Sequence, residues 1–137
     1  MSESHRATLT ERGVIRVTGD DAREFLQGLI SNDIRRVAPG RAIYAALLTP
    51  QGKYLFDFFI AEADGALLID CERARLADLI KRLSLYKLRA KATLEDVSES
   101  YRVVAVWGAG SLDALGLGPD AGAATPYAGG AAFTDPR

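Results

Sequence analysis

The chain has 137 residues, 17 of them basic and 18 acidic, and its net charge at neutral pH is −1. This length suits one domain with a core of its own, and the balanced charge excludes a general attraction to nucleic acid or anionic membranes. No apolar run approaches the roughly 20 residues of a membrane span, and the polar start does not resemble a signal peptide. A single cysteine excludes an internal disulfide. These features predict a bacterial cytoplasmic protein.

The first predicted elements are a strand, a helix and a second strand. β-branched residues over 13–18 predict the strand. Apolar residues at helical spacing then predict a helix from about Asp21 to Asn32, and Asp21 and Glu24 have the spacing of a capping box. After a Pro-Gly turn, an apolar run over 42–48 predicts the next strand.

The chain then continues in the order strand, strand, helix, strand, strand, predicted over residues 54–60, 67–70, 73–86, 92–97 and 101–107. The whole order predicts an α+β sandwich with two helices on one face of a mostly antiparallel sheet. We expect a flexible terminus over 1–11, the domain over 12–108, and a Gly- and Ala-rich tail over 109–137. The tail contains one short predicted helix, Ser111–Leu115, and the start of a strand at 131–133.

Asp57 is the first candidate for a functional role, because it lies inside an otherwise apolar strand. A carboxylate in such a place is costly to bury unless it is hydrogen-bonded. Its pKa can then be raised, so that it serves as a ligand-binding group or a general base. The alternative is that Asp57 faces solvent or a backbone donor, and the residues alone favour this ordinary interpretation.

Asp70 is the second candidate, because it lies where a strand ends and a helix begins. Residues at such places often face a ligand crevice. The residues alone favour a simpler role as a helix-terminal acid, worth about 1 kcal/mol. The neighbouring Cys71 is expected to be packed and unreactive, since adjacent acids raise the pKa of a thiol. Cys71 and His5 are too few ligands for a metal site, so no metal is expected.

The segment 73–91 is strongly basic, with seven Lys or Arg residues against one acid, Asp78, which is a local charge of +6. Such a segment could bind a polyanion or nucleic acid, with Tyr86 stacking on a base. A solvated helix face is the more common explanation of a charge run. The neutral total charge makes a dedicated nucleic-acid binder the less favoured alternative.

Four segments, taken in order and spacing, resemble a known family: Phe25–Asp33 (FLQGLISND), Leu48–Asp57, Tyr86–Lys91 and Val104–Gly108. Together they are similar to the glycine cleavage T-protein (aminomethyltransferase) superfamily. The combination of LLTPQGKYLFDFFI with LYKLRAK resembles its YgfZ-type branch in particular. The similarity covers roughly residues 12–108.

This resemblance implies a ferredoxin-like half of a folate-binding domain, with tetrahydrofolate as the cofactor. It also implies a role in assembling or repairing iron–sulfur clusters, with iron–sulfur enzymes or assembly proteins as clients. By the same resemblance, Asp57 would engage the pterin or its reactive nitrogen, and Asp70 would contact the pterin. Lys87 and Arg89 would hold the anionic tail of the folate. No catalytic residue is assigned.

Two departures from the family pattern qualify these expectations. T-proteins usually carry two adjacent aspartates where this chain has Phe56-Asp57, which argues against the enzyme alternative, an aminomethyltransferase. The Lys-Gly-Cys-Tyr segment of the YgfZ branch is not present, and family members are about twice as long or more. We therefore expect the front half of a folate-binding protein. The non-enzyme alternative is a half-domain that dimerises or serves as an interaction module.

Overall fold

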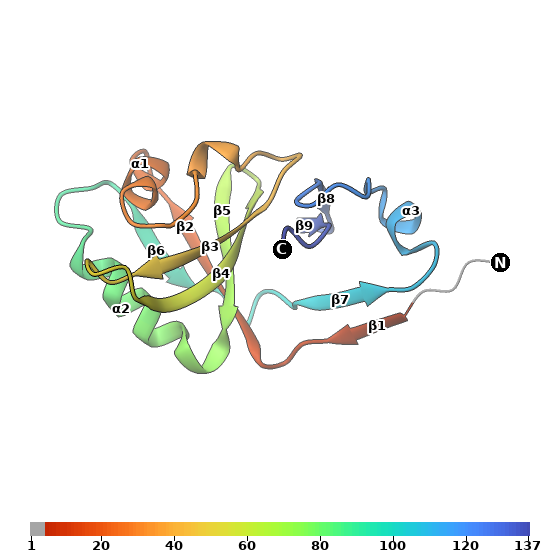
Figure 1. Cartoon of the computed structure of the whole chain (residues 1–137), viewed down its shortest axis with the longest axis horizontal. Coiled ribbons are helices and arrows are strands. Elements are labelled where there is room, and N and C mark those ends of the chain that lie inside the picture. The colour runs from red at the N-terminus through yellow and green to blue at the C-terminus, as the bar shows by residue number, and fades with distance from the viewer. Residues whose placement is uncertain (1–4) are drawn as a thin grey trace.

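The computed structural model describes residues 5–137, and at its centre is a five-stranded antiparallel sheet with the strand order β3-β4-β5-β2-β6. The strands are β2 (Arg12–Thr18), β3 (Ile43–Leu48), β4 (Tyr54–Ala63), β5 (Ala66–Glu72) and β6 (Thr93–Asp96). Helices α1 (Ala22–Gln27) and α2 (Leu76–Leu85) lie beside this sheet (Figure 1). The predicted α+β architecture with a mostly antiparallel sheet is therefore confirmed.

The core lies between the two helices and one face of the sheet, which is named the inner face. Strand residues alternate between faces, so each strand gives every second side chain to this core. The buried residues that build it include Ile15, Val17, Phe58, Ile60, Ile69, Leu26, Leu79 and Leu83. Burial of each such side chain is worth roughly 1.5–3 kcal/mol. The remaining strand residues lie on the opposite, outer face.

Helix α1 ends at Gln27, earlier than the predicted Asn32, because the following residues run along the free edge of β3. The Ser31 backbone N–H donates to the Ala46 carbonyl at 2.9 Å, and Asn32 Nδ2 donates to the Tyr44 carbonyl at 2.9 Å. These bonds satisfy backbone groups that a bare edge strand leaves open. The Ser-Asn sequence after the helix thus closes the sheet edge instead of extending the helix.

The predicted capping box at the start of α1 is wrong. Asp21 makes no side-chain bond to the helix. Its Oδ2 accepts a hydrogen bond from the Lys91 backbone N–H at 2.7 Å, and its own N–H donates to the Lys91 carbonyl at 3.0 Å. Tertiary contact with the segment that leads into β6 has replaced local capping. Helix α2 agrees better with prediction, since the predicted span divides into the 3-10 turn η2 (Arg73–Arg75) and α2.

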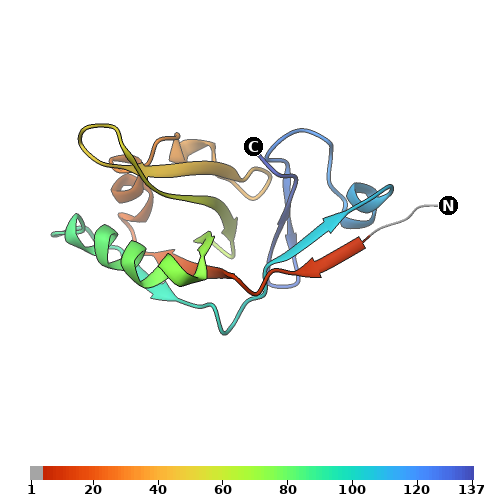
Figure 2. The ribbon, with the colours of Figure 1, turned by 60° about the horizontal axis from the view of Figure 1, so that its bottom comes forward.

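Two smaller strand pairs accompany the central sheet. Strand β1 (His5–Thr8) pairs antiparallel with β7 (Val104–Trp107), and this ribbon extends away from the sheet (Figure 2). The expected flexible terminus therefore contains a paired strand, and its first four residues lie outside the described part. The tail contains α3 (Ser111–Leu115), as predicted, and the hairpin of β8 (Ala124–Tyr127) and β9 (Gly130–Phe133), of which only the start of one strand was predicted.

The tail returns to the central sheet. The Ala42 backbone N–H donates to the Gly122 carbonyl at 2.7 Å, which ties the tail to the start of β3. The rings of Phe59 on β4 and Phe133 on β9 lie 5.6 Å apart between centroids. The last strand thus covers part of the outer face. Within residues 5–137, no helix is long and apolar enough to cross a membrane.

Candidate functional site

Alternation along neighbouring strands gathers polar and aromatic side chains on the outer face of the sheet. Tyr44 on β3 is the cross-strand partner of Phe59 on β4, and Phe59 is the partner of Asp70 on β5. Asp57 lies two residues before Phe59 and so shares its face. Arg12, the first residue of β2, reaches Asp70 from the next strand. These five residues are named the outer-face cluster.

Within this cluster, Asp57 is held in its ionised form. Burial acts to raise the pKa of Asp57, but hydrogen bonding by Tyr44 and Tyr54 outweighs it and lowers the pKa below its usual value. The Tyr44 hydroxyl donates to Asp57 Oδ2. This bond to the carboxylate raises the pKa of Tyr44 to about 12, so the phenol keeps its proton. An ionised carboxylate only accepts hydrogen bonds. Asp57 therefore suits recognition of ligand N–H groups better than general-base chemistry.

Asp70 lies inside β5, two residues before its end, so the interpretation as a helix-terminal acid is wrong. Arg12 Nε donates to Asp70 Oδ1 at 2.7 Å, and Arg12 Nη2 donates to the Asp70 carbonyl at 2.9 Å. Each of the two side chains is only 17% exposed. Burial raises the pKa of Asp70, although Arg12 opposes the shift. The raised carboxyl pKa that the sequence suggested for Asp57 thus occurs at Asp70.

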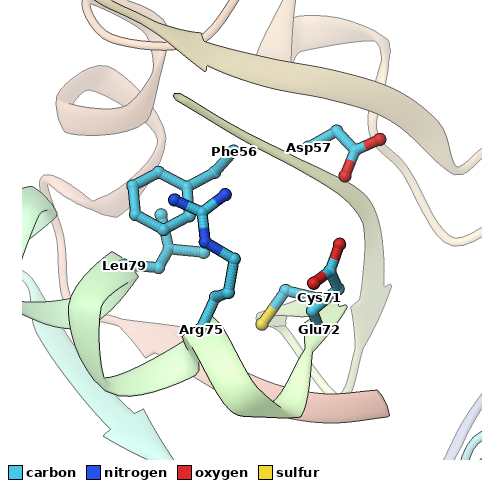
Figure 3. Close-up of a pocket in the computed structure, with 6 residues that line it drawn as sticks. All are labelled: Phe56, Asp57, Cys71, Glu72, Arg75 and Leu79. Carbon is cyan, nitrogen blue, oxygen red and sulfur yellow. The ribbon is translucent and has the colours of Figure 1, made fainter. Parts of the chain in front are cut away.

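A small hollow opens beside Asp57, where the ladder between β4 and β5 does not continue. Arg75 of η2 occupies this gap and donates through Nη1 to the Leu55 carbonyl at 2.6 Å. Its guanidinium carbon lies 4.1 Å from the centroid of the Phe56 ring. Figure 3 shows Asp57 and Phe56 on opposite sides of β4. The hollow is lined by Phe56, Asp57, Cys71, Glu72, Arg75 and Leu79.

Phe56 and Cys71 both belong to the core. Phe56 is 6% exposed and faces the helices, since adjacent strand residues face opposite sides. An acid at this position would be buried among apolar side chains, so Phe56 packs and Asp57 alone presents a carboxylate to the outer face. Cys71 is buried as well, and its burial raises the pKa of the thiol to about 12. The prediction of a packed cysteine is confirmed, and its low reactivity stays a prediction that the raised pKa supports.

Lys87 and Arg89 do not join the outer-face cluster. Both lie in the connection between α2 and β6, where Arg89 lines an open groove together with Phe25 and Leu29. Phe25 belongs to the core on the inner face of the sheet. The structure therefore brings Asp57 and Asp70 together and places the two cations on the side of the helices.

Three further residues at the outer face were not predicted from the sequence. These include Arg12 and Tyr44. Tyr44 could have been recognised from the sequence, because it is the only polar side chain in its apolar strand. No sequence pattern indicated the third residue, Arg137. Its guanidinium carbon lies 5.1 Å from the Phe59 ring centroid and 6.0 Å from that of Tyr44. Among residues 5–137, no three His, Cys, Asp or Glu side chains gather closely enough to hold a metal ion.

Comparison with known proteins connects this domain to two groups. The profile of the GCVT N-terminal domain matches residues 8–121. The iron–sulfur cluster assembly factor IBA57 homolog, mitochondrial, of Mycosarcoma maydis is 36% identical over 118 residues, which is 77% of this chain and 29% of that protein. The mouse protein, iron–sulfur cluster assembly factor IBA57, mitochondrial, is 35% identical over 105 residues, 66% of this chain and 29% of its own length. The chain thus spans under a third of these relatives.

A solved structure has the same fold. The glycine cleavage system aminomethyltransferase T from Bartonella henselae superposes with a TM-score of 0.75 at 16% identity, covering 93% of this chain and 37% of that one. At this identity the likeness establishes the fold, and it confirms the T-protein architecture expected from the sequence. The curated relatives are named as mitochondrial, whereas the bacterial cytoplasm stays a prediction for this chain.

Proposed function

We propose that this chain, which belongs to the GCVT N-terminal domain family, is part of a YgfZ- and IBA57-type protein that supports the assembly or repair of iron–sulfur clusters. The observation that carries the proposal is the similarity to named cluster assembly factors, at 36% and 35% identity. The proposed partners are iron–sulfur enzymes or the proteins that deliver clusters to them. Cys71 is not proposed as a cluster ligand, because it is buried and its burial raises the pKa of the thiol to about 12.

The second part of the proposal is that the outer-face cluster binds the pterin of tetrahydrofolate. The reduced pterin of tetrahydrofolate has a planar pyrimidine ring with N–H groups along one edge. The cluster offers an ionised carboxylate at Asp57 and the aromatic rings of Tyr44 and Phe59 beside it. These groups fit hydrogen bonding to the ring edge and stacking on the ring face. Asp70 is already paired with Arg12, so its role is to hold β2 against β5 beneath the ligand.

The tail of the folate is not assigned to Lys87 and Arg89 in this proposal. Arg89 lines a groove with core residue Phe25 on the helix side, whereas Asp57 faces the outer side of the sheet. Asp57 and Arg89 therefore lie on opposite faces of the sheet. Arg137, which pairs with Asp135 at 2.7 Å, is an exposed cation near the cluster, with its guanidinium carbon 5.1 Å from the Phe59 ring centroid.

Binding of folate without aminomethyl transfer is the form of the proposal that the residues favour. Transfer of an aminomethyl group needs a carboxylate that accepts a proton at the reacting nitrogen. The lowered pKa of Asp57 makes it a weak base, and Phe56 occupies the neighbouring position in the core. Release of ammonia that depends on tetrahydrofolate, measured with the full-length protein and the other glycine cleavage components, would restore the enzyme alternative.

The role in cluster assembly is tested in cells that lack the encoding gene. Activities of several iron–sulfur enzymes are compared with those of enzymes that hold no cluster, with protein amounts measured alongside. We expect the first group alone to lose activity and the wild-type gene to restore it. Equal activities in both strains would contradict the proposal.

Folate binding is tested by calorimetric titration of the full-length protein with tetrahydrofolate under anaerobic conditions. Asp57→Asn removes the charge at constant size, and Asp20→Asn is the matched control at an exposed site. A hydrogen bond to a charged group is worth roughly 1.5–3 kcal/mol, so Asp57→Asn should weaken binding by about tenfold or more. The control should bind like the wild type. If Asp57→Asn and Asp20→Asn bind tetrahydrofolate with equal affinity, Asp57 is not part of the binding site.

A further inference from the structure

A second surface lies on the other side of the molecule, around the connection from α2 to β6. Leu88 at its tip is 88% exposed, and Leu85 and Tyr86 before it are 65% and 46% exposed. Single exposed apolar residues are common, but neighbouring large ones mark interaction surfaces. Residues 85–91, together with the groove beside them, are named the loop surface.

The loop holds Leu88 in a fixed and unfavourable backbone conformation. The φ of Leu88 is +46°, a left-handed value that residues with a Cβ rarely adopt. Two anchors keep the loop in place: the Ala90 N–H donates to the Lys87 carbonyl at 2.8 Å, and Lys91 exchanges two hydrogen bonds with Asp21. An apolar side chain presented to solvent from an anchored, strained loop stabilises nothing within the described fold. Such strain is characteristic of functional positions.

A groove runs beside this loop and gives the surface a concave part. Its apolar lining consists of Phe25, Leu29, Tyr86 and Ala90. Phe25 and Leu29 come from α1 and the residues just after it, so the groove lies between two segments far apart in the sequence. Arg89 lines the basic side and Glu24 the opposite side. The groove therefore combines an apolar lining with charged residues at its border, as peptide-binding surfaces do.

The charge of the loop surface is one-sided. Residues 85–91 contain three cations and no acid, Lys87, Arg89 and Lys91, and two more cations, Lys81 and Arg82, precede them on α2. None of these five takes part in an ion pair within residues 5–137. The groove lining adds two acids, Asp21 and Glu24, and Asp21 Oδ2 accepts a hydrogen bond from the Lys91 backbone N–H at 2.7 Å. The five cations over residues 81–91 thus outnumber the two acids of the groove, and the excess positive charge lies on the loop and the end of α2.

From this geometry we propose that the loop surface docks an acidic segment of a partner protein, with an apolar side chain of that segment packed against Leu88 and in the groove. A planar membrane could touch the tip of the loop but could not fill the groove. Nucleic acid would use the cations and Tyr86 but would leave Leu85 and Leu88 uncovered. An acidic and apolar peptide satisfies all of these features. The proposal does not depend on folate binding at the outer face.

The test uses the full-length protein and a random peptide library displayed on phage. Peptides are selected on the wild type after removal of those that bind the double variant Leu88→Asn/Arg89→Glu. Leu88 is almost fully exposed and Asn tolerates left-handed backbone, so this change leaves the fold intact. We expect the selected peptides to be enriched in Asp and Glu beside Leu, Phe, Tyr or Trp. Selection of no sequence class, or of basic peptides, would overturn the proposal.

Fluorescence anisotropy with one selected peptide then assigns the contacts. Leu88→Asn and Arg89→Glu should each weaken binding on the order of tenfold, as central interface residues do. The control Tyr127→Asn removes an exposed aromatic side chain elsewhere and should change nothing. Equal binding by Leu88→Asn overturns the apolar part of the proposal. Binding to vesicles of phosphatidylserine that depends on Leu88, without peptide binding, would identify a membrane contact in its place.

Discussion

Removal of the ion pair between Arg12 and Asp70 is the strongest structural test of the outer-face cluster. Substitution Arg12→Met keeps the apolar stem and removes two hydrogen bonds, one of 2.7 Å to the Asp70 carboxylate, which is 17% exposed, and one of 2.9 Å to the Asp70 backbone carbonyl. Breaking a fully buried pair costs about 3–5 kcal/mol. Partial access of water reduces this, so we expect a loss of about 2–3 kcal/mol in the free energy of unfolding.

Removal of the stranded charge should recover part of that loss. In the double variant Arg12→Met/Asp70→Asn no ionised group is left without a partner. The coupling between the two sites should therefore be about 1–2 kcal/mol. Urea unfolding followed by circular dichroism measures all four proteins of this cycle. A cost below about 0.5 kcal/mol for Arg12→Met, within the range of ordinary surface changes, would refute the role given to the pair.

The pH dependence supplies an independent check. Burial already raises the pKa of Asp70 in the wild type, and loss of Arg12 removes the interaction that opposes this shift. The folded Arg12→Met variant therefore binds the proton more tightly than its unfolded chain does. Its deficit in stability should be smallest below the unfolded pKa of about 3.9 and should grow as the pH rises through the higher folded pKa. A deficit that does not change with pH would contradict this account.

Three further substitutions and one test of thiol reactivity have defined outcomes. Tyr44→Phe removes a hydrogen bond to the ionised carboxylate, so the pKa of Asp57 should rise in a carbon-13 NMR titration; an unchanged pKa would contradict the assignment. Phe56→Asp buries an acid in the core and should cost about 3 kcal/mol or more, measured by urea unfolding. Cys71 should react slowly with a thiol reagent in native protein and rapidly in urea, and fast native reaction would show an open core. Gly19→Ala should destabilise by about 2 kcal/mol or more, because its φ is +111° and a Cβ would lie 2.1 Å from a carbonyl oxygen; normal thermal stability would contradict that.

The two candidate carboxylates were found from the sequence because each interrupts an apolar run. Local pattern is enough to show that Asp57 and Asp70 are unusual, since the period of a strand and the hydropathy of its neighbours are both written in the chain. The state of each acid was not accessible in this way. Asp57 has a lowered pKa because Tyr44, thirteen residues earlier, bonds to it, and Asp70 has a raised pKa because burial outweighs its bond to Arg12.

The sequence by itself determined the kinds and order of the main elements, the two-layer architecture, the packed cysteine and, through quoted motifs, the family. These follow from period, composition and local turn chemistry, which act between near neighbours. Tertiary structure alone decided the early end of α1, the pairing of β1 with β7, and the separation of Arg89 from Asp57. Each of these depends on which distant strands and loops meet. Register and face are set by the packing of the whole sheet, and no short stretch of sequence specifies them.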